Sequence, residues 1–152
     1  MLKASRKLLF AIEAVLDIAY NAANTPVQSR DITERQGIPR RYLEPVLQQL
    51  VRADILTGVR GPRGGYRLAR ERRRISLGEI CRIVESGSVE QQEALEDTEG
   101  SDLGREVVRP LWAEMQAALL EKLDAISIED LCEQARQKGI DSAAKAPLDF
   151  TI

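Results

Sequence analysis

Histidine is absent from this chain of 152 residues, and cysteine occurs only twice. Because histidine is the usual acid–base group and the commonest metal ligand, its absence argues against both an enzyme and a zinc or iron site. Cys81 and Cys132 form no C-x-x-C pair, and each falls on an apolar stripe. We therefore expect two inert buried thiols in a reducing cytoplasm, without a disulfide framework.

Long hydrophobic runs are missing as well. Leu8 to Ile12 is apolar, but Glu13 and Asp17 interrupt the pattern, which argues against both a signal sequence and a membrane span. The apolar fraction of 43% is sufficient for a core. The length supports one domain plus an appendage. We expect a cytoplasmic protein.

The net charge is only −2, but the charges are unevenly distributed along the chain. Residues 1–75 contain 15 Lys and Arg against 7 Asp and Glu, a net charge of +8. Residues 76–152 contain 7 against 17, a net charge of −10. This segregation predicts a basic binding face beside an acidic partner region. Two solvated surfaces would give the same distribution, and that alternative stays open.

The centre of the chain, from Gln28 to Leu68, has the pattern of two helices and a hairpin. Ser29 is a suitable N-cap for a short helix that ends at Gly37, since glycine readily adopts the left-handed C′ conformation. A second helix is predicted from near Arg40, with a buried stripe at i, i+3, i+4 and i+7. The residues of this stripe are Leu43, Val46, Leu47 and Leu50.

Two short strands are predicted after the second helix. Ile55 to Arg60 and Tyr66 to Leu68 flank a glycine-rich tip, residues 61–65, and glycine can take the positive φ values of a tight hairpin. Helix, turn, helix and an arginine-rich hairpin together predict a winged helix-turn-helix.

Further helices are predicted on both sides of this centre. One runs from Ala4 to Ala22, a capping box at Ser76 and Glu79 starts another, and Ser127 caps the last one. We expect four units: 1–84, the winged helix-turn-helix domain; 85–102, an acidic flexible loop; 103–139, dimerisation helices; and 140–152, a tail.

The helix predicted from Leu103 to Ile126 repeats apolar residues every four positions. Pro110 should kink this helix or mark its true start. Its apolar face has no room in the main domain, so the same helix of a second copy is the economical partner. The predicted dimer interface consists of Leu103, Val107, Leu111, Trp112, Met115, Leu119 and Leu123. A small-molecule pocket around Trp112 is the alternative.

Three motifs, G-I-P-R-R-Y-L-E, V-R-G-P-R-G-G-Y-R-L and I-S-L-G-E-I, follow one another in the first half of the chain. In order and spacing they resemble the Rrf-two family of bacterial transcription regulators, which includes IscR-like and CymR-like members. The resemblance covers residues 2–84 closely and the helix around Trp112 loosely. It implies a homodimeric DNA-binding regulator in which Glu44 reads a base and Arg60 contacts the minor groove.

The exposed face of the second helix carries residue types that can read base edges. Arginine matches guanine, glutamine matches adenine, and glutamate accepts a hydrogen bond from cytosine N4. For Glu44, an ion pair with Arg40 or Arg41 is the alternative. Pro45 follows it and biases it away from helical geometry. The predicted DNA-binding residues are Arg40, Arg41, Tyr42, Glu44, Gln48, Arg60, Arg63, Gly64, Ser29, Arg30, Lys3, Arg6 and Lys7.

Cluster-binding members of the family carry three cysteines ahead of the long helix, whereas residues 85–109 of this chain contain none. An iron–sulfur cluster bound in the family's usual way is therefore not expected, and we predict no metal and no other cofactor.

Taken together, these patterns predict a mostly α protein with a small β-hairpin wing and a long C-terminal dimerisation helix. We expect a cluster-free homodimeric repressor on a palindromic double-stranded DNA operator. Its input would come from a small molecule, a thiol change or a metabolic enzyme as partner. A link to cysteine or sulfur metabolism rests on the resemblance alone. The alternatives are an interaction adaptor without DNA binding, a sensor of unknown ligand, and a degenerate cluster protein using Cys81 or Cys132.

Overall fold

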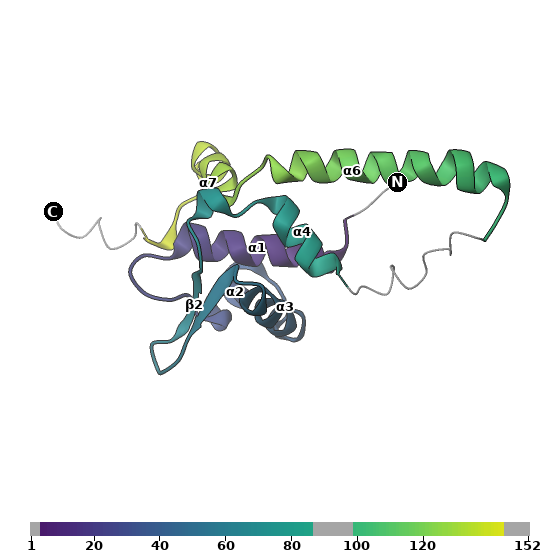
Figure 1. Ribbon diagram of the computed structural model, residues 1–152. Helices are drawn as coiled ribbons and strands as arrows, with labels where there is room; N and C mark the ends of the chain where they lie inside the picture. The colour runs from purple at the N-terminus through teal and green to yellow at the C-terminus, as the bar shows by residue number, and fades with distance from the viewer. Residues whose placement is uncertain (1–3, 87–98, 145–152) are drawn as a thin grey trace.

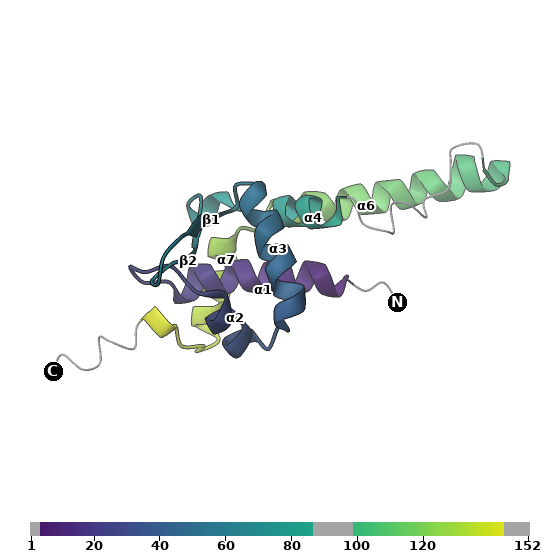
Figure 2. The same ribbon diagram turned by 90° about the horizontal axis from the view of Figure 1, so that it is seen from below.

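The first half of the protein is built on a central helix, α1, against which two further helices pack. The computed structural model describes residues 4–86 and 99–144. α1 (Arg6–Asn21) starts after Ser5, whose hydroxyl accepts a hydrogen bond from the Leu8 N–H. α2 (Ser29–Gln36) and α3 (Arg40–Arg52) both pack against it. Figures 1 and 2 show α2 and α3 together on one side of α1.

The ends of α2 differ in part from the prediction. Gly37 follows the helix in the left-handed conformation, with φ of 67°, as expected. The N-cap, however, is Gln28 and not Ser29, and no side chain caps this end. Ser29 is instead the first helical residue, and its hydroxyl turns toward α3. The prediction was wrong by one residue, because capping depends on backbone geometry that residue type alone does not determine.

The core is formed by one continuous apolar cluster drawn from nearly every element. The predicted stripe of α3 is confirmed, because Leu43, Val46, Leu47 and Leu50 are all buried. α4 (Leu77–Glu85) packs beside α1 and α3, and begins with the predicted capping box of Ser76 and Glu79.

The wing is the antiparallel hairpin of β1 (Leu56–Val59) and β2 (Gly65–Leu68), with Leu56 opposite Leu68 and Val59 opposite Gly65. Val27 adds a bridge to β2, where its N–H and carbonyl both bond to Tyr66 at 2.9 and 2.8 Å. The wing is therefore tied to the segment that leads into α2.

The last helix, α7 (Ile128–Gln137), belongs to the core and not to the projecting part of the molecule. Ile128 and Cys132 are fully buried, and α7 contacts α1 and the short helix η1 (Arg72–Arg74). Ser127 and Asp130 form a capping box, which confirms Ser127 as the cap. The prediction grouped this helix with the long helix as the dimerisation helices of residues 103–139. In the structure, α7 packs instead against α1 and η1.

The long helix is α6 (Arg109–Asp124), and a π-helical turn, η2 (Gly104–Val108), leads into it. Pro110 occupies the first turn of α6, so it marks the start, one of the two predicted alternatives. The helix extends past α4 and out beyond the body, on the side of α1 away from α2 and α3 (Figure 1).

A bidentate ion pair holds the inner end of α6 against α4. Arg82 donates to both carboxylate oxygens of Asp124, at 2.6 and 2.7 Å, and this contact lowers the pKa of Asp124. Gly78 lies so close that an added Cβ would be 2.8 Å from the Asp124 Cγ. None of the described helices is long and apolar enough to cross a membrane.

Two of the expected units lie largely outside the described residues. The predicted acidic loop, residues 85–102, is described only at 85–86 and 99–102. Of the predicted tail, residues 140–144 are described. Here the Ile140 carbonyl accepts a bond from the Tyr20 hydroxyl, and the Ala143 N–H donates to the Asn21 side chain at 3.0 Å. The start of the tail is therefore anchored to the end of α1.

Candidate nucleic-acid interface

On the side of α3 opposite to its buried stripe, a second stripe of residues faces outward. Arg41, Glu44, Pro45 and Gln48 have the spacing i, i+3, i+4 and i+7, and apart from Glu44, which is half-buried, they are exposed. Pro45 lies in the interior of this helix and has no backbone N–H. The Arg41 carbonyl, four residues earlier, therefore lacks its usual helical hydrogen bond. The predicted base-reading residues therefore share one surface of one helix.

Glu44 is held by two neighbours on different helices. The Ser29 hydroxyl of α2 donates to its Oε1 at 3.3 Å, and the Arg40 Nε lies 3.4 Å from the same oxygen. The ion pair with Arg40, which was the alternative for Glu44, is thus present. The pair is exposed, with 81% of the Arg40 side chain accessible, so its contribution is below about 1 kcal/mol and it can separate easily.

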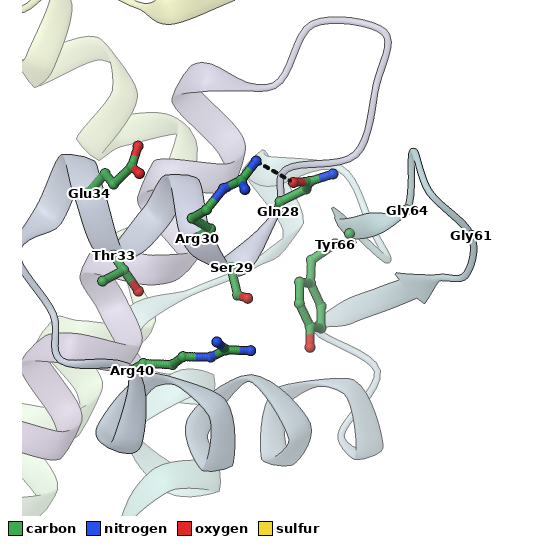
Figure 3. A pocket seen from close by; sticks show the side chains of 10 residues that line it. Gln28, Ser29, Arg30, Thr33, Glu34, Arg40, Gly61, Gly64 and Tyr66 are labelled. Atoms are coloured by element: carbon green, nitrogen blue, oxygen red, sulfur yellow. Dashed lines mark hydrogen bonds between the residues drawn. The ribbon is translucent and has the colours of Figure 1, made fainter.

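A cleft of about 550 Å³ opens between α2, the start of α3 and the wing. Figure 3 shows Ser29, Arg40 and Tyr66 pointing toward one another across it, with Arg30 and Gln28 at its upper edge. Burial, followed by the charge of Glu44, raises the pKa of the Tyr66 hydroxyl. This hydroxyl therefore stays protonated at neutral pH, and it accepts a long bond of 3.5 Å from Gln48.

At the wing tip, the two predicted arginines and the predicted glycine differ in exposure to solvent. Arg60 and Arg63 are exposed at the tip, as a contact with DNA requires. Gly64 is buried, and its N–H donates to the Gly61 carbonyl at 2.9 Å. An added Cβ on Gly64 would lie 2.9 Å from the Arg60 carbonyl carbon. The clearest role of Gly64 is therefore to close the hairpin.

A second hollow, of about 340 Å³, lies on the other side of α3, against the start of α1. Arg6 and Lys7 of α1 are exposed at its rim, together with Arg41. Arg41 folds back over the Tyr42 ring, with its guanidinium carbon 4.8 Å from the ring centroid, and also donates to the Tyr42 hydroxyl at 3.1 Å. The third predicted cation of this end, Lys3, lies outside the described residues.

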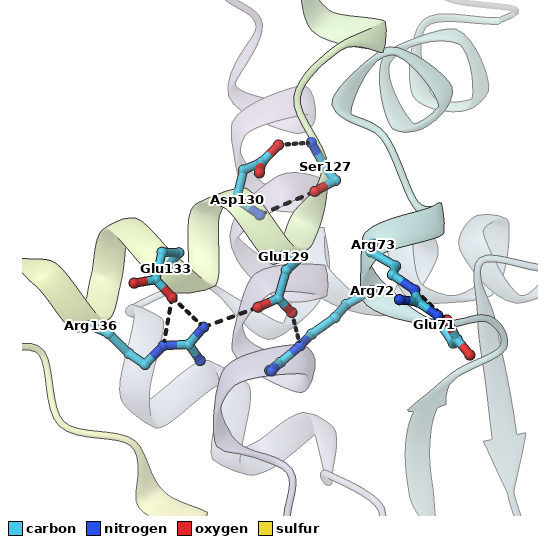
Figure 4. Close-up of polar contacts among 8 residues, drawn as sticks. All are labelled: Glu71, Arg72, Arg73, Ser127, Glu129, Asp130, Glu133 and Arg136. Carbon is cyan, nitrogen blue, oxygen red and sulfur yellow. Dashed lines mark hydrogen bonds and ion pairs between the residues drawn. The ribbon is translucent and has the colours of Figure 1, made fainter.

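The arginines that follow the wing are engaged with carboxylates. Arg70 lies 3.0 Å from Glu79, Arg73 lies 2.7 Å from Glu71, and Arg72 pairs with Glu129. Figure 4 shows the last pair extending to Arg136 and Glu133 on α7. Part of the predicted basic surface is therefore neutralised, by Glu79 and Glu129 of the acidic half and by the neighbouring Glu71.

The fold thus brings most of the predicted residues to one side of the molecule, on α3, the wing and the starts of α1 and α2. Sequence reasoning did not select Gln28, Thr33, Tyr66 or Phe10, which line the two hollows. For Tyr66 a signal was available, since it ends the G-G-Y motif. Gln28, Thr33 and Phe10 have no distinguishing local pattern, because their positions depend on how α1, α2 and the wing meet.

Known proteins are similar in sequence to this chain over most of its length. A family model described as "Rrf2: Iron-dependent Transcriptional regulator" matches residues 4–134. The HTH-type transcriptional regulator IscR of Xenorhabdus nematophila is 34% identical over 141 residues, covering 92% of this chain and 84% of the relative. The chain belongs to the Rrf2 family.

Solved structures of Rrf2 proteins have the same fold. IscR of T. potens matches with a TM-score of 0.74 and 32% identity, over 93% of each chain. CymR, the global cysteine regulator of B. subtilis, matches with a TM-score of 0.69 and 28% identity, over 88% of this chain and 98% of CymR. The predicted fold class is confirmed, and the protein is a DNA-binding transcriptional regulator.

The family description mentions iron, but the donor atoms of this Rrf2 regulator do not fit an iron–sulfur site built from cysteine and histidine. The whole chain has no histidine and only two cysteines, which lie on α4 and α7. Within residues 4–86 and 99–144, no group of three His, Cys, Asp or Glu side chains could hold a metal ion. An iron–sulfur cluster held by cysteine and histidine therefore does not fit this chain.

The two thiols differ in a way that the sequence did not predict. Cys132 is fully buried, as expected, but Cys81 is only half-buried, so the expected burial was wrong for Cys81. Burial is the main cause that raises the pKa of both thiols. Both are therefore protonated at neutral pH and react slowly.

The outer face of α6 remains apolar and exposed in the single chain. Among the predicted dimer residues of α6, Trp112 is 49% exposed and Leu119 58%, and Leu103, which precedes η2, is 73% exposed. Leu123 differs from these, because it is half-buried against the core cluster at the inner end of the helix.

Proposed function

We propose that this Rrf2 regulator is a homodimeric repressor that reads a palindromic DNA operator with α3 and the wing. The observation that supports the proposal most strongly is the placement of the exposed α3 stripe. Cations flank it on both sides, Arg6 and Lys7 on α1 and Arg60 and Arg63 on the wing. A recognition helix in the major groove needs this arrangement, since phosphate contacts position a helix and base contacts give it specificity.

Within this arrangement, the side chains of α3 have separate roles. Glu44 accepts a hydrogen bond from cytosine N4 once Arg40 moves away to a phosphate, and Gln48 is suited to adenine. Arg41 leaves the Tyr42 ring to reach guanine; the exposed ring contact costs only about 0.5–1 kcal/mol to break. Ser29 and Arg30, at the start of α2, contact the backbone.

The wing arginines act in the neighbouring minor groove. Arg60 precedes the tip and Arg63 lies in it, and the other tip residues are three glycines and one proline, so the tip can approach the DNA closely. Arginine in a narrow minor groove reads the width of the groove more than the base identity. The wing therefore adds shape specificity to the base contacts of α3.

The dimer forms through α6. Its exposed apolar residues lie outside the body, where a second copy of the same helix can cover them. Two copies then present two recognition helices, which matches a palindromic operator.

The regulator acts in the cytoplasm, without a cluster, a metal or catalytic activity. Its signal is a small molecule, a thiol change or a metabolic enzyme that acts on the C-terminal half. The likeness to CymR, which is named for cysteine regulation, supports a role in sulfur metabolism.

Fluorescence anisotropy of the protein on its own upstream DNA, titrated with salt, tests the proposal. Binding should weaken by about 10³–10⁵ between 50 and 200 mM salt if about eight phosphates are contacted. Arg41→Ala/Glu44→Ala should lose sequence preference while retaining salt-sensitive binding. Glu114→Gln, a change of charge on α6, is the control and should bind as the wild type does.

Absence of binding at low salt, with and without cell extract, would contradict the proposal and favour the adaptor. Recovery of binding by extract would instead identify a required co-ligand, which fractionation of the extract can isolate.

A further inference from the structure

Pro45 lies in the middle of the recognition surface, between Glu44 and Gln48 on the exposed stripe of α3. A proline inside a helix removes one backbone hydrogen bond and is normally costly. It also cannot donate a hydrogen bond, and its ring offers only an apolar surface. Whatever Pro45 contacts on DNA must therefore be apolar.

The surroundings of Pro45 extend this apolar surface. Pro45 lines the 340 Å³ hollow between α3 and α1 together with Phe10, Tyr42 and Val46. The rings of Phe10 and Tyr42 are tilted against each other, with centroids 6.1 Å apart. Tyr42 remains 40% exposed, so the floor of the hollow is aromatic and open to a ligand.

The rim of the same hollow is cationic. Arg6, Lys7 and Arg41 line it, and none of the residues that line it is acidic. An apolar floor with a positive rim is complementary to a ligand that has a small apolar group beside a negative charge.

We propose that this hollow reads the C5-methyl group of a thymine in the operator. The proposal rests on the proposed DNA-binding function. In the major groove of unmodified DNA, the thymine methyl is the apolar feature on the base edges. The hydrogen-bond donors and acceptors of the bases are read by polar side chains, such as Glu44 and Gln48. Pro45 and Tyr42 contact the methyl, while Arg6 and Lys7 bind phosphates on the same side of α3.

The size of the effect follows from the area that one methyl buries. Burying one such group contributes about 0.8 kcal/mol, or about fourfold in affinity for each half-site. A symmetric change in both half-sites of a palindrome should therefore cost about 16-fold, if the two effects are independent.

Replacing thymine by uracil removes this methyl group and leaves the hydrogen-bonding edge unchanged. The probe is the duplex that wild-type protein binds most tightly among those it selects from a random pool. In this duplex, the two symmetry-related thymines at each position are replaced together by uracil, one position at a time. Wild-type protein should show one symmetric position where uracil weakens binding by about 16-fold. At that position, Pro45→Gln should bind the thymine and uracil duplexes equally.

Two further variants keep the result interpretable. Pro45→Ala favours the helix and keeps one apolar carbon, so it should retain an intermediate preference for thymine. Lys7→Ala should weaken binding to both duplexes equally and lower the salt dependence. Circular dichroism verifies that each variant is folded.

The possible failures are distinguishable. If the wild type selects no duplex, with or without cell extract, both the proposed function and this inference are wrong. If it binds tightly but tolerates uracil at every position, or if Pro45→Gln keeps the full preference, DNA binding stands and the thymine contact is refuted.

Discussion

Asp17 is a buried carboxylate that lies next to the apolar core cluster. Its side chain is fully buried and accepts three hydrogen bonds from α2: from Arg35 Nε at 2.9 Å, Arg35 Nη2 at 2.8 Å and Gln36 Nε2 at 2.7 Å. The hydrogen bond to Asp17 is also the main cause that raises the pKa of Arg35. This one residue joins α1 to the end of α2, directly before the turn that leads into α3.

Replacing Asp17 by Ala should lower the free energy of unfolding by about 2–3 kcal/mol. Removing one member of a fully buried pair typically costs about 3–5 kcal/mol, and Arg35 is exposed enough to recover part of its hydration. Urea denaturation followed by circular dichroism measures the change. Glu34→Ala, an exposed neighbour on the same helix, should stay within about 0.5 kcal/mol of the wild type. Equal stabilities of the two variants would show that Asp17 does not support α2.

At the scale of the element, the wing depends on the backbone at its tip more than on its side chains. An added Cβ at Gly64 would meet the backbone carbonyl groups at the end of β1 and in the tip. An added Cβ at Gly58, within β1, would meet nothing within 4 Å. Both glycines belong to the same hairpin. They therefore form a matched pair for testing what holds the wing in place.

Gly64→Ala should destabilise the protein by about 1–3 kcal/mol, because the new methyl group forces the tip to open. Moving the tip displaces Arg60 and Arg63 as well, so affinity for DNA should fall. Gly58→Ala should leave stability within about 0.5 kcal/mol of the wild type. Thermal denaturation and anisotropy on the selected duplex measure the two effects. A Gly64→Ala protein with wild-type stability would contradict the close approach at this position.

At the scale of the whole molecule, α6 carries its apolar face away from the body. The Arg82–Asp124 contact fixes its inner end, on the side opposite to α2 and α3 (Figure 1). A second copy that covers this face would leave both recognition helices free. The proposed dimer contact and the proposed DNA-binding face therefore lie on different sides of the protein.

Met115→Glu/Leu119→Glu should convert a dimer into a monomer of 17.0 kDa, because two charges would enter the covered face. Affinity for a palindromic operator should then fall by at least about 100-fold, since the two half-sites are no longer bound by one linked molecule. Ala113→Glu/Ala117→Glu adds the same charges with the same spacing to the other side of α6. Analytical ultracentrifugation of both variants tests the prediction, and a dimeric Met115→Glu/Leu119→Glu protein would refute it.

The features that the sequence by itself determined are local ones. The apolar stripe of α3, the capping box at Ser76, the cap at Ser127 and the left-handed end at Gly37 each depend on residues a few positions apart. Helix periodicity and backbone conformation act over that range, so these elements could be predicted. The lack of a cysteine triad before the long helix was equally visible.

Only the tertiary structure decided which distant residues meet. It placed α7 in the core, exposed part of Cys81, and brought Ser29 of α2 to Glu44 of α3. It also paired Arg72 with Glu129 and joined Phe10 to Tyr42 beside Pro45. Such contacts depend on the angles at which the elements pack, and those angles result from the burial of all apolar stripes together. No local pattern contains that information, which is why the surface around Pro45 emerged only from the fold.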